Sequence, residues 1–467
     1  MLKKFQMMVP LLGPFFSLIV YLASSNLEAA QQTFLAIFTF VVYSWLFTNT
    51  PLYVTGFIGV GLSGIFNLAS AKDILANFGH PIIYLFLAGF LLAFAFHKVG
   101  LDRRISLYLL TRNFIKGSIS RLLFTLMFLT ATFTMWISNT ATTAMMLPLV
   151  LGVLDSLDIK DKKSVSLILI CIAYASSIGG IATPIGSTPN IIALGMLDDY
   201  IGLKVSFFEW MMYSLPIATI LLAILFVLTH IALKKKNIVF ENSFLETEYK
   251  KLPPISTQEK YVFGIFLLTV IFWIAPSFAK LFGVKLPLDF TPGMVGLTTA
   301  SLLYLFPIRG EKILETTDIK KIDWSSLMLF GCGLALGKLL YELGLTKLTG
   351  ELLTQFVTGM NPLFIFLFVF AFVIFSTELT SNTATANILI PIMISLAQEL
   401  GMNPFFLAFG VSLSCSLAFM LPVATPPNAI VYGSERVDKK DMMQLGLGLN
   451  IIYSIVLGII IYTYSLF

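Results

Sequence analysis

Residues 134–148 read TMWISNTATTAMMLP, and residues 377–391 read TELTSNTATANILIP. The two stretches share seven identical residues in the same register. These are Thr134, Ser138, Asn139, Thr140, Ala141, Thr142 and Pro148 in the first stretch, and Thr377, Ser381, Asn382, Thr383, Ala384, Thr385 and Pro391 in the second. A chance match between two Ser/Thr-rich helices rarely keeps so many identities in register. We therefore interpret the two stretches as copies of one element.

Each copy is followed by a second polar motif inside an apolar run. Residues 186–190 read GSTPN, and residues 424–428 read ATPPN, so both motifs end in Pro-Asn. Proline interrupts a helix because it has no backbone N–H to donate. The sequence therefore predicts two repeat units, each with one polar Ser-Asn-Thr tip followed by one broken helix.

The composition around these motifs is that of a membrane protein. Hydrophobic residues make up 57% of the chain and charged residues only 12%, and the mean hydropathy is +0.89. A soluble domain carries about twice that charged fraction. At about 20 apolar residues per helical span, the chain has room for roughly ten to twelve spans. We expect an all-α polytopic membrane protein.

Hydropathy and helix breakers place about eleven full spans. They lie near residues 9–24, 33–49, 52–68, 80–98, 165–198, 208–233, 260–276, 291–307, 323–342, 404–434 and 443–465. Two more apolar segments, 121–156 and 362–400, each contain one Ser-Asn-Thr motif near the middle. Each of these two is either one irregular span or a re-entrant hairpin.

The positions of Lys and Arg favour two hairpins. If both segments return to the side from which they enter, Lys3, Lys4, Arg103 and the run Lys234–Lys236 all fall on one side, as do most other basic residues. Treating each segment as an ordinary span would place the run outside, against the positive-inside rule. The two hairpins then have opposite orientations, which is an inverted-topology repeat. We expect a protein of the plasma (inner) membrane, with a cytoplasmic N-terminus and an extracytoplasmic C-terminus.

A hairpin tip inside the membrane suits a small anion. The helix that starts at each tip offers free N–H groups and the positive end of its dipole. Ser, Asn and Thr side chains add neutral donors. Two tips that face each other are therefore suited to the two ends of a dicarboxylate, and neither tip contains a basic residue.

The same geometry suits a hard cation. Backbone carbonyls that lose their helical partners, together with Ser, Thr and Asn oxygens, are suitable ligands for Na⁺. Thr134 lies one turn before Ser138, and Thr377 lies one turn before Ser381, on the same helical face. Each tip and the broken helix after it are therefore expected to form one cation site.

Two ionisable residues within apolar segments are functional candidates. Glu378 lies three residues before Ser381. It either pairs with nearby donors and braces the tip, which we favour, or carries a proton. Lys338 lies in the span at 323–342 and either has a functional role or extends its amine to the membrane surface; we favour the second.

The sequence lacks the residues that an enzyme or a metal-binding protein would need. An intramembrane enzyme needs a nucleophile with a base, or a metal cluster, and no His, Lys or paired Asp lies near the tips. The three cysteines are isolated in apolar runs, which indicates packed thiols rather than disulfides or a metal site. Two tips that enter from opposite sides would close a continuous pore, so alternating access fits better than a channel.

The paired tips with GSTPN and ATPPN resemble the divalent anion/sodium symporter family. The resemblance extends to LMLFGCGLALGK at 327–338 and MLPVATPPNAI at 420–430, and it spans nearly the whole chain. It implies a homodimer that moves C4-dicarboxylates, citrate or sulfate, mostly with Na⁺. It also implies an elevator mechanism with a scaffold domain and a transport domain. Residues 1–118 and 245–358 would form the scaffold, and 119–244 and 359–467 the transport domain.

The resemblance also implies roles for single residues. The substrate-binding residues would be Ser138, Asn139, Thr140, Ser381, Asn382, Thr383 and Thr425. The first Na⁺ site would be formed by Thr134, Ser138, Asn139 and the Gly186 backbone. The second would be formed by Thr377, Thr380, Asn382 and the Ala424 backbone.

The main hypothesis is a Na⁺-coupled symporter of succinate, malate or fumarate. The alternative of the same fold is a Na⁺-independent dicarboxylate antiporter, and an intramembrane enzyme is the least favoured. Na⁺ is the expected coupling ion. We expect no organic cofactor and no nucleic-acid partner. The tips do not distinguish among dicarboxylate, citrate and sulfate.

Overall fold

The computed structural model describes residues 2–115, 118–156, 159, 161–234, 243–284, 286, 288 and 290–467. This part of the chain is almost entirely helical, with one short antiparallel pair, β1 (Pro307–Ile308) and β2 (Glu311–Lys312). Several basic residues used to predict the orientation lie outside the described residues, namely Lys116, Lys160, Lys235, Lys236 and Lys285.

The helices form two series in the order predicted for two repeat units. Helix α1 (Leu2–Ala23) precedes both. The first series is α2 (Ala29–Phe47), α3 (Leu52–Ile65), α4 (Ala71–Ala76), η1 (Asn77–Gly79), α5 (Pro81–Lys98), α6 (Leu101–Leu110), η2 (Asn113–Ile115), α7 (Ile119–Thr134), α8 (Asn139–Ser156), α9 (Lys162–Gly180), α10 (Thr188–Ile201) and α11 (Phe207–Lys234). After α12 (Ser243–Lys250), the second series is α13 (Thr257–Leu281), α14 (Pro292–Leu305), η3 (Asp318–Lys321), α15 (Trp324–Glu342), α16 (Leu345–Val357), α17 (Pro362–Thr377), α18 (Asn382–Glu399), α19 (Pro404–Cys415), α20 (Pro426–Tyr432) and α21 (Lys439–Ser465).

The eleven predicted spans all coincide with helices, and the two predicted broken spans are α9–α10 and α19–α20. In the described part of the chain, 7 helices are long and apolar enough to cross a membrane, or up to 8 if a bent pair counts as one span. The other four predicted spans coincide with shorter apolar helices, namely Leu12–Ala23, Leu52–Ile65, Pro292–Leu305 and Pro404–Cys415. The expectation of an all-helical, multi-pass membrane protein is confirmed.

The two series pack against each other reciprocally. Helix α3 of the first series packs on α15 of the second, and α14 of the second packs on α5 of the first. A repeated hydrogen bond accompanies this exchange. Trp45 Nε1 donates to the carbonyl oxygen of Leu52 (2.9 Å), and Trp273 Nε1 donates to that of Pro292 (2.9 Å), each at the start of the next helix. Such matched contacts are expected when two copies of one unit face each other.

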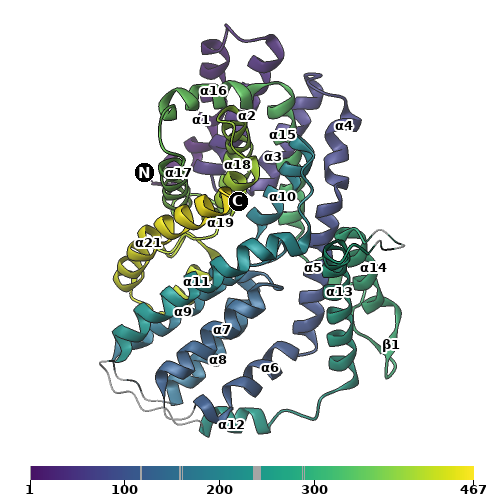
Figure 1. Cartoon of the computed structure of the whole chain (residues 1–467), viewed down its shortest axis with the longest axis vertical. Helices are drawn as coiled ribbons and strands as arrows, with labels where there is room; N and C mark the ends of the chain where they lie inside the picture. Colours follow the sequence, from purple (N-terminus) through teal and green to yellow (C-terminus); the bar gives the residue numbers. More distant parts are fainter. Residues whose placement is uncertain are drawn as a thin grey trace.

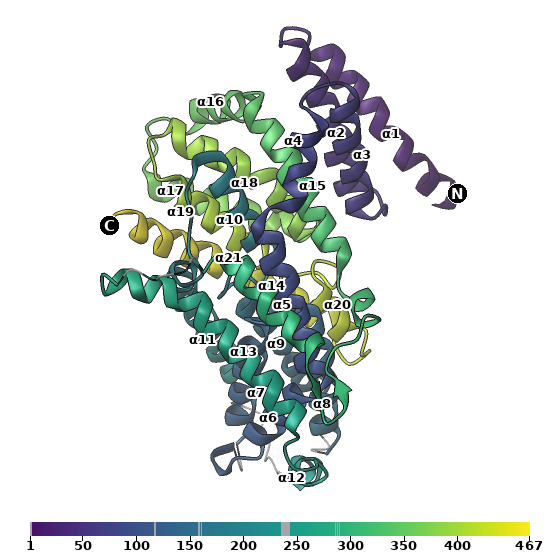
Figure 2. The same ribbon diagram turned by 90° about the vertical axis from the view of Figure 1, so that its right-hand side faces the viewer.

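Both Ser-Asn-Thr segments are helical hairpins. Helices α7 and α8 are joined by residues 135–138 and pack together and on α9. Helices α17 and α18 are joined by residues 378–381, pack together, and both contact α19. Figures 1 and 2 show the first hairpin in the lower half of the molecule and the second in the upper half. This arrangement agrees with hairpins of opposite orientation.

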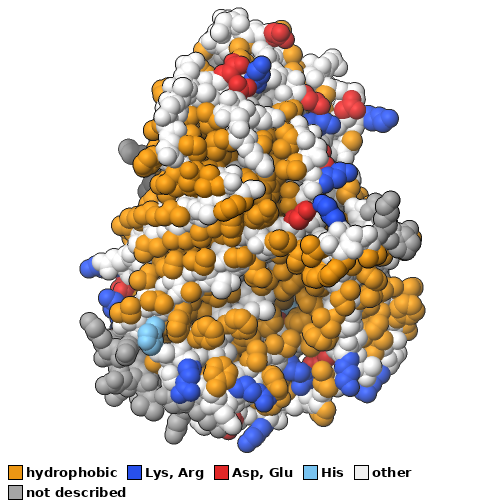
Figure 3. Space-filling view, in the orientation of Figure 1, with side chains coloured by type: hydrophobic (Ala, Val, Ile, Leu, Met, Phe, Trp, Pro, Cys, Tyr) orange, Lys and Arg blue, Asp and Glu red, His pale blue; other side chains and the backbone are white. Residues whose placement is uncertain are grey.

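The surface has the polarity of a membrane protein. Figure 3 shows apolar side chains over the middle of one face, with Lys and Arg gathered along the lower edge, where α6 and α12 lie. This basic edge corresponds to the side of the molecule that the sequence predicts to be cytoplasmic. The orientation itself stays a prediction.

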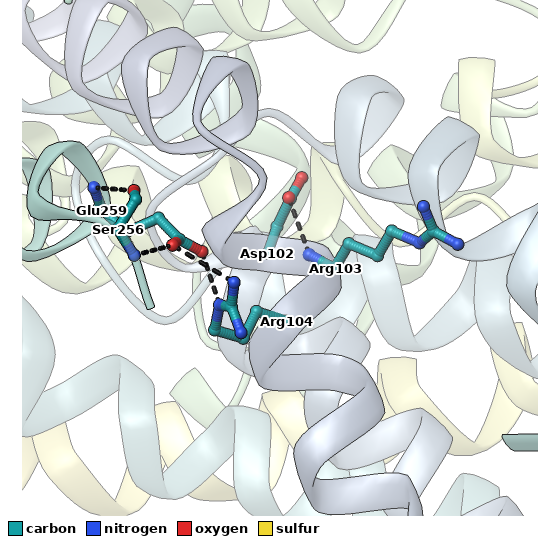
Figure 4. Close-up of polar contacts among 5 residues, drawn as sticks. All are labelled: Asp102, Arg103, Arg104, Ser256 and Glu259. Atoms are coloured by element: carbon teal, nitrogen blue, oxygen red, sulfur yellow. Dashed lines mark hydrogen bonds and ion pairs between the residues drawn. The ribbon is translucent and has the colours of Figure 1, made fainter. Parts of the chain in front are cut away.

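A buried ion pair fixes the short helix α6 at that edge. Gly100, with φ +77, begins α6 in the left-handed conformation that glycine adopts without strain. Arg104 Nε donates to Glu259 Oε1 (2.5 Å), and Arg104 Nη2 donates to Oε2 (3.2 Å). Glu259 also accepts from the Ser256 N–H at the start of α13, as Figure 4 shows. Helix α6 is thereby tied to the N-terminus of α13.

Replacing Arg104 with methionine should destabilise the protein by about 3–5 kcal/mol, because it leaves the buried Glu259 carboxylate without its charged partner. Thermal unfolding of the detergent-solubilised protein measures this change. The adjacent Arg103→Met is the matched control, because the Arg103–Glu248 pair is more exposed, with 59% and 19% of the two side chains accessible. Its loss should cost about 1 kcal/mol or less. Equal shifts in the two variants would contradict the role given to Arg104.

Candidate functional site

The two hairpin tips line one cavity of about 840 Å³. Most residues predicted for the site line it, namely Ser138, Asn139, Thr140, Gly186, Thr380, Ser381, Asn382, Thr383, Ala424 and Thr425. Thr134 and Thr377 do not line it, because both are fully buried at the ends of α7 and α17. The structure therefore brings the two copies of the repeated element together, as their similarity predicted.

Each tip exposes the start of a helix to the cavity. Helix α8 begins at Asn139 and α18 begins at Asn382, so each helix starts within its Ser-Asn-Thr motif. The first N–H groups of a helix have no partners inside the helix. In the first tip, Ser138 Oγ accepts from the Ala141 N–H (3.3 Å), whereas the Ser381 side chain makes no capping bond. The N–H groups of Asn139, Thr140, Asn382 and Thr383 have no partner within their own helices, and such groups can bind an anion.

Four buried amide oxygens near the tips accept no hydrogen bond within the described structure. They are Oδ1 of Asn139, Asn190, Asn382 and Asn428. Asn139 corresponds to Asn382, and Asn190 to Asn428, so the same two positions are affected in both copies. A buried acceptor without a donor costs about 1–3 kcal/mol. The same cost recurs in both copies, and amide oxygens without a donor are groups that can coordinate a hard cation.

In the first copy, several oxygens converge at the break between α9 and α10. A methyl group added to Gly186 would lie 2.5 Å from the Gly180 carbonyl oxygen and 2.8 Å from that of Thr134. A methyl group added to Gly180 would lie 2.4 Å from Asn139 Oδ1. Thr134, Asn139 and Gly186 are thus close together, as the sequence predicted. Gly180 was missed, although the Gly179-Gly180 pair just before the break was a signal for close approach of the backbone.

In the second copy, the corresponding residues come from the tip between α17 and α18 and from the break between α19 and α20. Thr380 Oγ1 lies 2.7 Å from Thr385 Oγ1 and donates to the Ser376 carbonyl oxygen (2.8 Å). Thr425 caps α20 by accepting from the Asn428 N–H (3.3 Å). Asn382 Oδ1 stays without a donor. The two copies therefore present similar oxygen atoms, but the hydrogen bonds around these atoms differ between the copies.

The asparagine of each Pro-Asn motif bridges the break before it. Asn190 Nδ2 donates to the carbonyl oxygens of Gly180 (3.0 Å) and Thr183 (2.8 Å). Asn428 Nδ2 donates in the same way to Ala418 (3.3 Å) and Leu421 (3.0 Å). The two Pro-Asn pairs are evident in the sequence, but no role was predicted for their asparagines. The shared motif was the available signal.

Part of the cavity wall is apolar. It includes Phe86, Phe90, Ala93 and Phe94 of α5. A polar solute in the cavity would therefore find its donors and acceptors mainly on the hairpins and broken helices.

Charged residues gather at one end of the cavity. His97 Nδ1 lies 2.6 Å from Asp102 Oδ2, and Lys321 Nζ donates to Asp318 Oδ1 (2.9 Å). Burial raises the pKa of Asp318, but hydrogen bonds from Lys98, the Glu315 N–H and Lys321 outweigh burial and lower the pKa to about 2. Asp318 thus holds the ammonium groups of Lys98 and Lys321 as ion pairs beside the cavity.

The two ionisable residues singled out in the sequence have different environments. Glu378 lines the cavity and its side chain accepts hydrogen bonds from backbone N–H groups of residues 419–421. This supports the brace. Lys338 is not among the residues that line the cavity; its Nζ lies 3.9 Å from Glu342 Oε1, and its side chain is 37% exposed. This supports the interpretation that Lys338 reaches the membrane surface.

Comparison with known proteins finds one family over almost the whole chain. Residues 4–467 match the family described as the sodium:sulfate symporter transmembrane region. An uncharacterized transporter of Haemophilus influenzae is 36% identical over 443 residues, which cover 94% of this chain and 93% of that protein. The sodium-dependent dicarboxylate transporter SdcS of Staphylococcus saprophyticus is 31% identical over 470 residues, covering 97% and 90%.

Two solved structures share the fold. The YdaH transporter of Alcanivorax borkumensis superposes with a TM-score of 0.57 at 13% identity, covering 86% of this chain and 88% of that one. MtrF of Neisseria gonorrhoeae gives a TM-score of 0.58 at 11% identity, covering 86% and 85%. These two structures show the fold. The family match over residues 4–467 and the relatives at 36% and 31% identity show that the chain belongs to the sodium:sulfate symporter family, which the motifs indicated as divalent anion/sodium symporters, and that it is a membrane transporter and not an enzyme.

Proposed function

We propose that the chain is a Na⁺-coupled symporter of C4-dicarboxylates such as succinate, malate and fumarate. The observation that carries the proposal is the pairing, in both copies, of a helix start that faces the cavity with amide oxygens that have no donor. The helix starts suit the two carboxylates of the anion, and the oxygens suit Na⁺. The sodium-dependent dicarboxylate transporter among the relatives supports the same assignment.

The roles of the predicted residues follow from this pairing. One carboxylate would be held by Ser138, Asn139 and Thr140 of the first tip. The other would be held by the second tip, Ser381, Asn382 and Thr383, together with Thr425. One Na⁺ would lie among the oxygens of Thr134, Ser138, Asn139 and Gly186, and Gly180 is added to this set by its position. The other would lie among Thr377, Thr380, Asn382 and Ala424. Two Na⁺ ions would balance the charge of a dicarboxylate without a basic residue at the tips.

We further propose an elevator movement. The hairpins and broken helices offer the polar groups, while α5 offers a wall of Phe86, Phe90 and Phe94. A solute held by one side only moves with that side. Residues 119–244 and 359–467 would then form the moving transport domain, and residues 1–118 and 245–358 the scaffold, within the homodimer that the family resemblance implies.

Uptake of labelled succinate into proteoliposomes tests the coupling. With an inward Na⁺ gradient, we expect accumulation that stops when choline replaces Na⁺. Citrate and sulfate, added as competitors, test the choice of anion, and succinate, malate or fumarate should compete best. Uptake that needs dicarboxylate inside the vesicles but no Na⁺ would instead establish the antiporter.

A further inference from the structure

Helix α15 has two glycines at which side chains of other helices lie directly on its backbone. A methyl group added to Gly333 would lie 2.5 Å from Cγ and 2.8 Å from Nδ2 of Asn387 on α18. A methyl group added to Gly337 would overlap the hydroxyl of Tyr200 on α10. Helices α10 and α18 both pack on α15, so the amide and the hydroxyl are held in one close interface. We call these four residues the α15 seam.

The polar atoms of the seam are buried without hydrogen-bond partners in the described structure. Asn387 is 2% exposed, and neither its Oδ1 nor its Nδ2 has a partner. The hydroxyl of Tyr200 has none either, although the Tyr200 ring stacks on that of Tyr341 with 5.0 Å between the centroids. Burial of an amide or a hydroxyl without a partner is unfavourable. The seam is thus closely packed, but its polar atoms lower its stability.

The first copy has the opposite arrangement at the position of Asn387. Counted from the serine of each Ser-Asn-Thr motif, Ala144 corresponds to Asn387. Ala144 is exposed and lines the cavity. Burial alone would favour the apolar residue in the interface and the polar residue at the cavity. An asparagine at the buried position is understandable if the seam does not stay closed, because an open seam gives the amide access to water.

Asn387 and Tyr200 are not arranged as ligands for the transported solutes. Neither is among the described residues that line the cavity between the tips. Their polar ends lie against the backbone of α15 at glycines, which have no side chain to donate or accept a hydrogen bond. The seam therefore differs from Asn139 and Asn382, which line the cavity and whose amide oxygens also have no donor.

We propose that Asn387 and Tyr200 make the α15 seam easy to open and thereby set the rate at which α10 and α18 move along α15. This inference rests on the proposed elevator movement, in which α15 belongs to the scaffold and α10 and α18 belong to the transport domain. The unpaired amide and hydroxyl raise the free energy of the closed seam. Water hydrates both groups once the seam opens, so the open seam is not destabilised in this way. The two residues thus lower stability and raise the rate of transport.

Thermal unfolding in detergent and succinate uptake into proteoliposomes test the inference with Asn387→Leu. Leucine has the branched shape of asparagine without its polar atoms, so it removes the unfavourable contribution from the closed seam. The unfolding temperature should rise, the uptake rate should fall about tenfold, and the amount of ²²Na⁺ bound at saturation should stay unchanged. Gln398→Leu changes an exposed amide on the same helix and is the matched control, which should change none of these. A lower unfolding temperature or an unchanged uptake rate in folded Asn387→Leu would overturn the inference.

Tyr200→Phe decides the question if Asn387→Leu does not fold. It removes one oxygen atom and keeps the ring that stacks on Tyr341. The same two changes are expected, a higher unfolding temperature and slower uptake. A substitution that only damaged the packing would instead lower both the unfolding temperature and the uptake rate, and that result would contradict the role given to the hydroxyl.

Opening of the seam is measured independently with a water-soluble maleimide. Asn387→Cys should react in proteoliposomes, because the open seam admits water. Ala408→Cys on α19 is equally buried and lies outside the seam, so it should not react, and the three native cysteines are buried as well. Lack of reaction at position 387 in protein that takes up succinate would overturn the inference and leave the proposed function intact. If the unmutated protein shows no Na⁺-coupled uptake, the proposed function fails, and the maleimide reaction still shows whether the seam opens.

Discussion

Replacing Asn139 or Asn382 with alanine is expected to abolish dicarboxylate transport, to about 1% of the unmutated rate or less, while the protein stays folded. Each residue starts the helix that faces the cavity, and its Oδ1 is buried without a donor. The amide group would contact both the anion and the cation, so its removal disrupts both binding sites. Since no hydrogen bond to Oδ1 is lost within the protein, the free energy of unfolding should change by only about 1 kcal/mol.

Succinate uptake into proteoliposomes and thermal unfolding in detergent measure the two effects separately. Asn403→Ala is the matched control. Asn403 caps α19 through Oδ1, which accepts from the Phe405 N–H (3.0 Å). Its side chain is exposed, and it lies outside both Ser-Asn-Thr motifs. Its loss should cost about 1 kcal/mol of stability without affecting transport by the folded protein. Normal transport by either tip variant would show that the two-tip site is wrong.

The fold was predictable because its deciding features are local. The repeated Ser-Asn-Thr tips and the Pro-Asn breaks are short motifs, and the distribution of Lys and Arg assigned their orientation. Each predicted span coincides with a helix, since apolar runs of this length in a membrane leave the backbone little choice but helix. The reciprocal packing of α3 on α15 and of α14 on α5 was not predicted in detail, because helix partners depend on surface shape that a single sequence does not reveal.

The site was predictable only in part, for a related reason. The residues of the tips follow from the motifs, but their partners come from distant positions. The side chain of Glu378 meets the backbone of residues 419–421 and the amide of Asn450, which is 72 residues away in the chain. Its sequence position left bracing and proton transfer both open. Only the three-dimensional contacts supply the four donors that favour the brace.

The structure was also needed to show whether the side chains of Thr134 and Thr377 face the cavity. Thr134 and Thr377 donate their hydroxyls back to the preceding turn, for example Thr134 Oγ1 to the Thr130 carbonyl oxygen (3.0 Å). Both are fully buried behind the tips. Near Gly186, the Thr134 atom that approaches the proposed cation site is the backbone carbonyl oxygen. A motif in the sequence indicates that Thr134 lies near the site, but it does not show which atom of Thr134 faces the site.

Replacing Gly186 with alanine is expected to remove Na⁺ binding at the first-copy site and to lower succinate uptake by about a hundredfold or more. The added methyl group would lie 2.5 Å from the Gly180 carbonyl oxygen and 2.8 Å from that of Thr134. Both are backbone atoms and cannot rotate away, so the methyl group must displace the oxygens or occupy the space between them. Overpacking of this kind also costs about 1–3 kcal/mol of stability.

The corresponding position of the second copy is Ala424, so a methyl group is compatible with a break of this type in general. The effect of Gly186→Ala should therefore depend on the oxygens near Gly186 and not on the break itself. Gly264→Ala on α13 is the control, because no atom lies within 4 Å of the added methyl group, and its uptake should be unchanged. If Gly186→Ala kept the full amount of ²²Na⁺ bound at saturation and the normal Na⁺ dependence of uptake, the first cation would have to lie elsewhere. Loss of half of the ²²Na⁺ bound at saturation would support a cation site between Thr134 and Gly180.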